Sequence, residues 1–252
     1  MAKVEVRTDT LVVGEDEVVR LAALLDVEEQ ARAARFRFDA HRRRFIVRRG
    51  RAREWLSEIT GRAPETLQFS TGPHGKPELP GGPCFSLSHS GETMMMAVSD
   101  AEVGCDIERE DAVLDWRPLA EGFFAPGEVA ALSALPAPEA RRAFFACWAR
   151  KEAFVKALGL GLSYPLDAFE VSVDEEARLV SGGEGWTLTS SELDGIVPDR
   201  IDVTGFTAGR RERGANRLAG DRRHASDRAL RAAFENTWDS RIETRRPETC
   251  FR

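Results

Sequence analysis

Two carboxylates stand two residues apart in the segment Val103–Glu108 of the chain, at Asp106 and Glu108. On a strand, residues two apart share a face, so both carboxylates point the same way while Cys105 and Ile107 point into the core. Adjacent carboxylates repel each other unless they are solvated, protonated or bridged by a cation. Taken alone, the pair indicates a strand that runs out into solvent, and a metal site is the alternative.

A glutamate and a lysine, Glu152 and Lys156, stand four residues apart in a segment rich in apolar residues. On a helix this spacing places them on one face, where such a pair is an ordinary stabilising surface contact. The neighbours Phe144, Trp148 and Val155 bury much of the same helix, and Glu152 falls close to that apolar face. A partly buried glutamate needs a partner, so a functional acid is the alternative to a surface pair.

Two polar turns hold further candidates. Ser88 and His89 follow an alternating strand and precede Gly91, in a turn whose hydroxyls, imidazole and backbone N–H groups suit phosphate oxygens. Lys76 lies in a glycine- and proline-rich turn that lacks the spacing of a P-loop. No Gly-x-Ser-x-Gly elbow surrounds these serines, which disfavours nucleophilic serine catalysis. A lone histidine is more often structural, so each feature is weak by itself.

The elements that must position these residues are short strands and amphipathic helices, which predicts the α+β class. The chain divides into two halves that meet near residues 100–110, each mixing helix with antiparallel-type strands. Hydrophobic periodicity and turn residues set the boundaries of the expected elements. We expect strands within 3–13 and at 84–87, 94–98, 103–107, 169–173 and 186–188, and helices from residue 15, over 28–59, and at 126–135 and 138–158.

Composition restricts the class of protein. A chain of 252 residues with 42% hydrophobic and 31% charged residues is typical of a globular protein with one large core or two small ones. It has no apolar run of the roughly 18 residues that cross a bilayer and no apolar signal core at the start, so we expect a cytoplasmic protein without a membrane partner. Cys84, Cys105 and Cys147 lack metal-ligand spacing and are expected in the core.

Charge is distributed unevenly along the chain. The net charge of −6 combines an acidic body with an arginine-rich stretch from Thr207 to Arg252, in which only residues 230–234 suggest a helix. This tail is weakly foldable in pattern, and we expect it to be poorly ordered. Lysine is scarce, which draws attention to the internal lysines Lys76, Lys151 and Lys156.

In combination and order, these features resemble the surfactin-synthetase-activating class of 4′-phosphopantetheinyl transferases. The resemblance covers roughly residues 28–175, and its most specific parts are the Asp-x-Glu strand and the Trp-x-x-Lys-Glu-Ala-x-x-Lys helix. The matching motifs are Arg35-Phe36, Asp39-Ala40-His41-Arg42, Gly75-Lys76-Pro77, Phe85-Ser86-Leu87-Ser88-His89-Ser90, Gly104-Cys105-Asp106-Ile107-Glu108 and Trp148–Leu162.

The resemblance implies transfer of 4′-phosphopantetheine from coenzyme A to a serine of an acyl or peptidyl carrier protein, with release of adenosine 3′,5′-bisphosphate. It implies that Asp106, Glu108 and Glu152 bind Mg²⁺, a cation that prefers carboxylate oxygens and phosphates. Glu152 would also be the base for the carrier serine, directly or through a metal-bound water. Lys156 would stabilise the pyrophosphate or the leaving group.

The remaining candidates would bind coenzyme A. The resemblance implies that Lys76, Ser88 and His89 contact its phosphates, and Arg32 and Arg42 its 3′-phosphate, a group that the planar fork of arginine suits.

The fold implied is a pair of similar α+β halves in a pseudo-dimer with the active site at their interface, here 1–102 and 103–206, followed by the tail 207–252. Members of the family end the second half with a further strand of small and apolar residues. This chain continues instead into Arg210-Arg211-Glu212-Arg213, so the second sheet is expected to lack a strand.

Two other functions compete with transfer. One is a non-catalytic module that binds coenzyme A or a nucleotide; three acids beside a polyphosphate argue against it. The other is a nucleic-acid-binding protein, suggested by the arginine-rich helix and tail; the acidic body argues against that, and we expect no nucleic-acid partner. We expect a monomer, and the sequence leaves open whether the carrier is of the polyketide, peptide or fatty-acid type.

Overall fold

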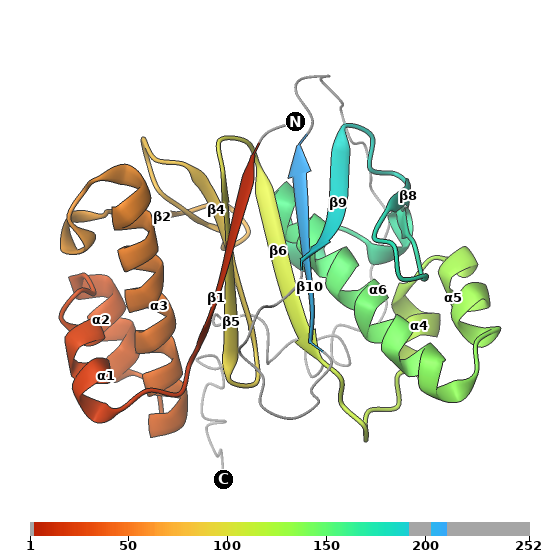
Figure 1. Ribbon diagram of the computed structural model, residues 1–252, viewed down its shortest axis with the longest axis horizontal. Helices are drawn as coiled ribbons and strands as arrows, with labels where there is room; N and C mark the ends of the chain where they lie inside the picture. The colour runs from red at the N-terminus through yellow and green to blue at the C-terminus, as the bar shows by residue number, and fades with distance from the viewer. Residues whose placement is uncertain (1–2, 192–202, 211–252) are drawn as a thin grey trace, which may run out of the picture. The chain divides into compact units, whose positions relative to one another are not determined.

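A computed structural model describes residues 3–191 and 203–210, and confirms the predicted α+β class (Figure 1). The described residues form two compact units, one made of residues 3–10, 68–191 and 203–210 and the other of residues 11–67. The tail from 211 to 252, with the expected helix at 230–234 and the question of a further strand after Arg210, lies outside the described residues.

The described residues hold six α-helices, ten strands and three 3₁₀ turns. The helices are α1 (Glu15–Ala22), α2 (Val27–Ala34), α3 (Asp39–Thr60), α4 (Arg117–Phe123), α5 (Pro126–Ser133) and α6 (Ala137–Leu158). The strands are β1 (Val4–Thr10), β2 (Ser70–Thr71), β3 (Pro77–Glu78), β4 (Cys84–Ser90), β5 (Thr93–Ser99), β6 (Val103–Arg109), β7 (Glu170–Val171), β8 (Leu179–Ser181), β9 (Trp186–Ser191) and β10 (Val203–Arg210). The 3₁₀ turns are Pro64–Thr66, Gly161–Ser163 and Leu166–Ala168.

The first unit contains two antiparallel sheets of three strands, in the orders β1-β5-β4 and β6-β10-β9. The pairs β2-β3 and β7-β8 form two smaller sheets. In the first large sheet Ser88 lies opposite Met95, and in the second Asp106 lies opposite Phe206. The strand β10, at the point where the sequence departs from the family pattern, is therefore the central strand of the second sheet.

The alternation predicted for β6 is confirmed. Cys105 and Ile107 are fully buried and pack with Met95 and Ala97 of β5 in one hydrophobic cluster. Cys147 is buried as expected, whereas Cys84 is only half-buried at the start of β4. All three thiols are free.

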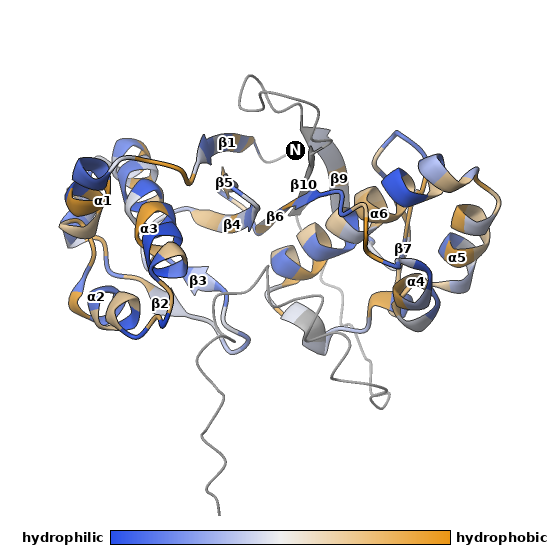
Figure 2. Ribbon diagram, turned by 90° about the horizontal axis from the view of Figure 1, so that it is seen from below, coloured by the Kyte–Doolittle hydropathy of each residue, from blue (hydrophilic) through white to orange (hydrophobic). Residues whose placement is uncertain are grey.

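Helix α6 is the central helix of the first unit. It packs against β6 and β10, and its residues are buried almost continuously from Phe144 to Ala157. Figure 2 shows much of α5 and α6 in the colours of hydrophobic residues, whereas α3 shows both orange and blue. Gly159 ends α6 in the left-handed conformation, with φ 69°, as predicted for a helix C-cap.

The closest approach of β6 to α6 occurs at Gly104. A Cβ added there would lie 2.1 Å from the carbonyl oxygen of Ala153 and 2.3 Å from the backbone nitrogen of Ala157. The strand therefore contacts the helix backbone directly, which only a residue without a side chain permits. This contact places Asp106, two residues later on β6, beside the last two turns of α6.

A buried ion pair joins α6 to α5. The Nζ atom of Lys151 lies 2.8 Å from Oε2 of Glu128 and donates to the carbonyl oxygens of Leu166 and Phe169 at 2.7 and 2.8 Å. Glu128 also accepts from the backbone nitrogen of Val171 at 2.7 Å. The ammonium thus has three protein acceptors, and this lysine of the Trp-x-x-Lys-Glu-Ala motif holds α5 and the segment before β7 against α6.

The second unit consists of α1 to α3. The helix predicted over 28–59 is in fact two helices, because the backbone leaves the helical conformation between Ala34 and Asp39. Helix α2 begins with a capping box. The Asp26 carboxylate accepts from the backbone nitrogen of Glu29, and the Glu29 carboxylate accepts from the backbone nitrogen of Asp26. Helix α1 packs closely on α3, since a Cβ at Gly50 would lie 2.7 Å from that of Leu21.

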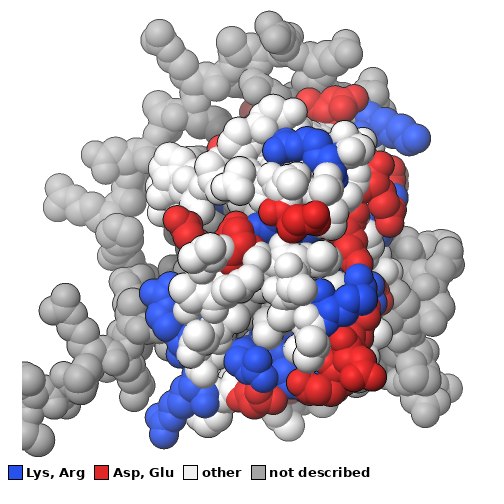
Figure 3. All heavy atoms as spheres, turned by 90° about the vertical axis from the view of Figure 1, so that its left-hand side faces the viewer, with Lys and Arg blue, Asp and Glu red and all other residues white. Residues whose placement is uncertain are grey.

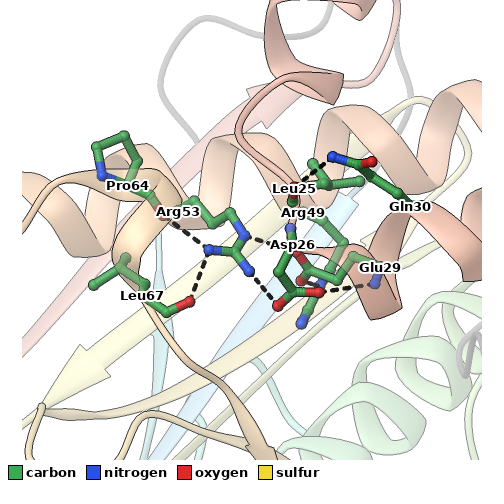
Figure 4. Close-up of polar contacts among 8 residues, drawn as sticks. All are labelled: Leu25, Asp26, Glu29, Gln30, Arg49, Arg53, Pro64 and Leu67. Carbon is green, nitrogen blue, oxygen red and sulfur yellow. Dashed lines mark hydrogen bonds and ion pairs between the residues drawn. The ribbon is translucent and has the colours of Figure 1, made fainter.

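Arginine 53 is fully buried at the centre of this unit (Figure 4). Its guanidinium contacts Asp26 at 2.6 Å and Glu29 at 2.7 Å, and donates to the carbonyl oxygens of Pro64 and Leu67 at 2.8 Å. A buried arginine with two carboxylates and two carbonyls satisfies its charge locally, and it ties α2 and the segment after α3 to α3.

Many of the other arginines in α3 are also in ion pairs. Arg51 contacts Glu17 and Glu54, and Arg20 of α1 contacts the same two acids. Seen from the left-hand side of Figure 1, basic and acidic side chains lie next to one another (Figure 3). The basic appearance of this helix in the sequence is therefore partly cancelled by Glu17 of α1 and by Glu54 of α3 itself.

Several other boundaries differ from the sequence predictions. The strand expected at 84–87 continues to Ser90, so Ser88 and His89 lie on a strand and not in a turn. The strand expected at 169–173 is only two residues long, and α4 was not predicted. Within residues 3–191 and 203–210, no helix has the length and apolar character that crossing a membrane requires.

The Gly104 contact yields a stability prediction. Gly104→Ala should lower the free energy of unfolding by at least about 2 kcal/mol, because the clash is with backbone atoms that no rotamer change can move. Gly122→Ala is the matched control: a Cβ there meets nothing within 4 Å, and alanine favours a helix. Urea unfolding of both variants checks this, and equal stability of Gly104→Ala and the parent chain would contradict the packing.

Candidate active site

The site is built on the line where β4 runs beside β6. Three serines at alternate positions of β4 face β6, as the period of a strand requires. Ser86 Oγ accepts from the backbone nitrogen of Cys105 at 3.1 Å, and Ser90 Oγ accepts from that of Arg109 at 3.0 Å. Between them, Ser88 Oγ donates to a carboxylate of β6. Side-chain hydroxyls thus bridge the two large sheets along these strands.

Asp106, Ser88 and Lys156 form a buried triangle. Lys156 Nζ lies 2.5 Å from Asp106 Oδ1 and 3.0 Å from Ser88 Oγ, and Ser88 Oγ lies 2.7 Å from the same carboxylate oxygen. Asp106 is 0% and Lys156 5% exposed. The simpler interpretation of the Asp-x-Glu pair, a strand in solvent, is therefore wrong for Asp106, and Lys156 is not a surface residue.

Glu152 lies one turn before Lys156 on α6 and is 1% exposed. Among the described residues neither of its carboxylate oxygens has a hydrogen-bond partner, and Oδ2 of Asp106 has none either. Glu108 is half-buried and accepts from Ser90 Oγ at 3.2 Å. A buried carboxylate without partners is costly, so the site is set up for a proton, a cation or a ligand that donates to these oxygens.

Burial and mutual repulsion set the electrostatics of the site. Loss of hydration raises the pKa of Glu152 to about 8, with Lys156 opposing the shift and Asp106 adding to it. The pKa of Asp106 is raised by burial despite its contacts with Lys156 and Ser88, and that of Glu108 is raised by burial and by the Asp106 charge. Burial disfavours the charged form of Lys156, but Asp106 and Glu152 outweigh it and raise its pKa.

The donor set has the chemistry of a hard-cation site. One ammonium, Lys156, pairs with Asp106, and three buried carboxylate oxygens of Asp106 and Glu152 have no partner within the described part of the chain. Oxygen ligands of this kind suit Mg²⁺ better than soft metals. Among the described residues, no three histidine, cysteine or acidic side chains are close enough together as they stand to hold an ion. Two of the carboxylates already have protein partners: Asp106 pairs with Lys156, and Glu108 accepts from Ser90.

The residues predicted to bind coenzyme A have diverse surroundings. Ser88 is in the buried triangle, and His89, half-buried, points to the opposite face of β4 by strand alternation. Lys76 donates to the carbonyl oxygens of two other segments and to Glu102. Arg32 and Arg42 belong to the second unit, where Arg32 lies over the Phe45 ring at 5.3 Å and Arg42 contacts Asp39 at 2.6 Å.

Sequence reasoning assigned no role to several residues that build the site. Ser86 and Ser90 belong to the motif but had no assigned role. The signal for one is that Ser86, Ser88 and Ser90 stand at every second position, which places three hydroxyls on one face of a strand. Gly104 precedes Asp106 by two residues, which is the signal for a close backbone approach. Glu128 carries no signal, because its partner Lys151 is distant in the chain.

The raised pKa of Glu152 predicts a pH-dependent stability in metal-free protein. Below about pH 4.5 the carboxyl is protonated in both states; as the pH rises toward 8, only the unfolded state loses the proton, so the native state loses stability. Relative to Glu152→Gln, the parent chain should lose on the order of 3 kcal/mol over this range.

Urea unfolding in EDTA at several pH values measures that difference. Glu65→Gln, at an exposed glutamate, is the control and should follow the pH profile of the parent chain. Parallel profiles for the parent chain and Glu152→Gln would mean that the Glu152 carboxyl titrates alike in both states.

Comparison with known proteins identifies the family of the chain. The sequence model of the 4′-phosphopantetheinyl transferase superfamily matches residues 102–192, a range that includes β6 and α6. The chain is 35% identical over 200 residues to the 4′-phosphopantetheinyl transferase HetI of Nostoc sp., covering 76% of this chain and 84% of that protein. It is 37% identical to a putative 4′-phosphopantetheinyl transferase of Synechocystis sp., covering 68% and 73% of the two chains. It is 30% identical to the 4′-phosphopantetheinyl transferase Sfp of Bacillus subtilis, covering 66% and 74%. At this identity and coverage, the chain belongs to the 4′-phosphopantetheinyl transferase superfamily of enzymes.

Proposed function

We propose that the protein transfers 4′-phosphopantetheine from coenzyme A to a serine of an acyl or peptidyl carrier protein, with release of adenosine 3′,5′-bisphosphate. The observation that carries the proposal is the buried group of Asp106, Glu152 and Lys156, in which carboxylate oxygens lack partners beside a fixed ammonium. Such an arrangement suits a polyphosphate substrate bound together with a divalent cation.

Glu152 is the proposed base. Its carboxylate would take the proton of the carrier serine, whose oxygen then bonds to the phosphorus of the phosphopantetheine group while the bond to the adenosine-bearing phosphate breaks. Burial raises the Glu152 pKa to about 8 even with Lys156 nearby, so further positive charge is needed to hold this carboxyl ionised at neutral pH. Lys156 would stabilise the pyrophosphate or the leaving group.

Asp106, Glu108 and Glu152 are the proposed Mg²⁺ ligands. When bound, Mg²⁺ would neutralise the negative charge that builds up on the pyrophosphate as the P–O bond breaks. The orphaned oxygens of Asp106 and Glu152 support this assignment. Ser88 and Ser90 hold Asp106 and Glu108 in position from β4.

Ser88, His89, Arg32 and Arg42 remain the proposed contacts of the coenzyme A phosphates. The pseudo-dimer of halves 1–102 and 103–206 is also part of the proposal. Its support is internal: each half contains one antiparallel sheet of three strands and one helix of 22 residues, α3 or α6, that ends at a left-handed glycine. A cytoplasmic monomer is the setting we propose.

A non-catalytic coenzyme A-binding module is the alternative from another class. It would bind the nucleotide but transfer nothing, and it gives no reason to bury three acids around one lysine. Nucleic-acid binding is disfavoured by the ion pairs that occupy arginines of α3.

The proposed reaction predicts a simple assay outcome. The protein with coenzyme A, MgCl₂ and an apo carrier protein should add the mass of one phosphopantetheine to the carrier, and EDTA should abolish the gain. Carriers of the polyketide, peptide and fatty-acid types are tested side by side by intact mass. No gain on any carrier, together with coenzyme A binding, would favour the non-catalytic module.

Glu152→Gln separates chemistry from folding. The amide has the shape of the carboxyl and breaks no hydrogen bond to residues 3–191 or 203–210, where the Glu152 oxygens have no partner. Loss of the base should lower the transfer rate at least about 100-fold while the fold is kept. Asp167→Asn, at an exposed aspartate of the same unit, is the control and should keep the parent rate. A near-normal rate of Glu152→Gln would move the base and the metal elsewhere.

A further inference from the structure

Lys76 is one of the most constrained lysines of the chain. Its Nζ atom donates to the carbonyl oxygen of Val103 at 3.0 Å, to that of Ala157 at 3.2 Å and to Oε2 of Glu102 at 3.0 Å. An ammonium has three donors, so each has a protein acceptor. The residue is only 9% exposed. No donor is left over for a phosphate unless one of these contacts breaks.

The two carbonyl acceptors belong to the two elements that carry the site. Val103 begins β6, three residues before Asp106, and Ala157 follows Lys156 in the last turn of α6. Carbonyls of a last helical turn lack intrahelical partners and carry the negative end of the helix dipole, so an ammonium is well placed there. One side chain thus joins the start of the strand to the end of the helix.

The lysine stem and Gly104 complete the same junction. Between the two acceptors, Gly104 brings β6 onto the backbone of α6 without an intervening side chain. At Gly159, the glycine that ends α6, Cδ of Lys76 lies 3.5 Å from where a Cβ would be, so the stem covers the helix end. Gly104 allows the close approach, and Lys76 prevents the helix from sliding along the strand.

We propose that Lys76 is a positioning residue, which clamps β6 to the C-terminal end of α6 and so holds Asp106 against Lys156, and that it is not a ligand of a coenzyme A phosphate. The clamp itself is a statement about the fold; its effect on rate rests on the proposed transfer reaction. A displacement of about 1 Å between reacting groups lowers rates about 100-fold, which makes such a clamp significant for catalysis.

The clamp is tested first without any activity. Because the chain has only four lysines, ¹⁵N-lysine labelling gives few ammonium signals, and exposed Lys3 should exchange too fast with water to be seen. Lys76 should give a slowly exchanging signal that Lys76→Met removes and that coenzyme A leaves in place. A Lys76 signal that is absent, or that shifts to a new position when coenzyme A binds, would overturn the proposal.

Kinetics then separate positioning from phosphate binding. Lys76→Met should lower kcat about 10- to 100-fold with the KM for coenzyme A changed less than about twofold. Its preference for coenzyme A over 3′-dephospho-coenzyme A should equal that of the parent. Lys3→Met, the same change at an exposed lysine, should leave both constants unchanged. A raised KM with kcat intact would identify a phosphate ligand and overturn the clamp.

Lys76→Arg adds a second discrimination. A guanidinium keeps the charge and binds phosphate well, but its planar fork cannot reproduce three bonds from one small ammonium. It should therefore be impaired like Lys76→Met, whereas full rescue would indicate phosphate binding. If Lys76→Met does not fold, the Lys76 ammonium signal of the parent chain and the kinetics of Lys76→Arg still distinguish the clamp from a phosphate ligand. If the parent transfers nothing to any carrier, the reaction is wrong while the ammonium signal still tests the clamp.

Discussion

The direct contact between strand β6 and the backbone of helix α6 is the constraint on which the first unit depends. Gly104 makes that contact possible, since any Cβ would overlap backbone atoms of the helix. Asp106 on the strand and Lys156 on the helix then come within 2.5 Å of each other. This packing distance brings the Asp106 carboxylate of β6 and the Lys156 ammonium of α6 together.

Burial of that contact creates an unbalanced charge. Asp106, Glu108 and Glu152 share one ammonium, and the loss of hydration raises the pKa of all three carboxyls. A chain selected only for stability has no reason to keep such a group, because an apolar residue would pack there at no electrostatic cost. The imbalance is relieved when positive charge enters, as the proposed binding of a divalent cation would provide.

The three internal lysines have a common structural role. Lys76, Lys151 and Lys156 are all buried, and each ties α6 to another segment: the start of β6, the 3₁₀ turn before β7, and Asp106. Buried arginines do similar work elsewhere: Arg53 contacts two carboxylates and two carbonyls, and Arg150 donates to the carbonyl oxygens of Ser172 and Asp174. The compact ammonium and the wide guanidinium thus each join segments by several donors from one side chain.

The sequence by itself determined the α+β class and most element centres, and it singled out acids and lysines that the structure brings together, because alternation, helix periodicity and ordered motifs are local or linear signals. It misjudged the extent of β4 and the break before α3, where small energetic differences decide. Only the tertiary structure decided that Asp106 is buried, that Lys156 pairs with it and not with Glu152, that Glu128 holds Lys151, and that the Lys76 ammonium faces backbone carbonyls. Residues that are far apart in the chain show no sequence spacing from which their contact could be predicted. Burial, likewise, depends on which elements pack together.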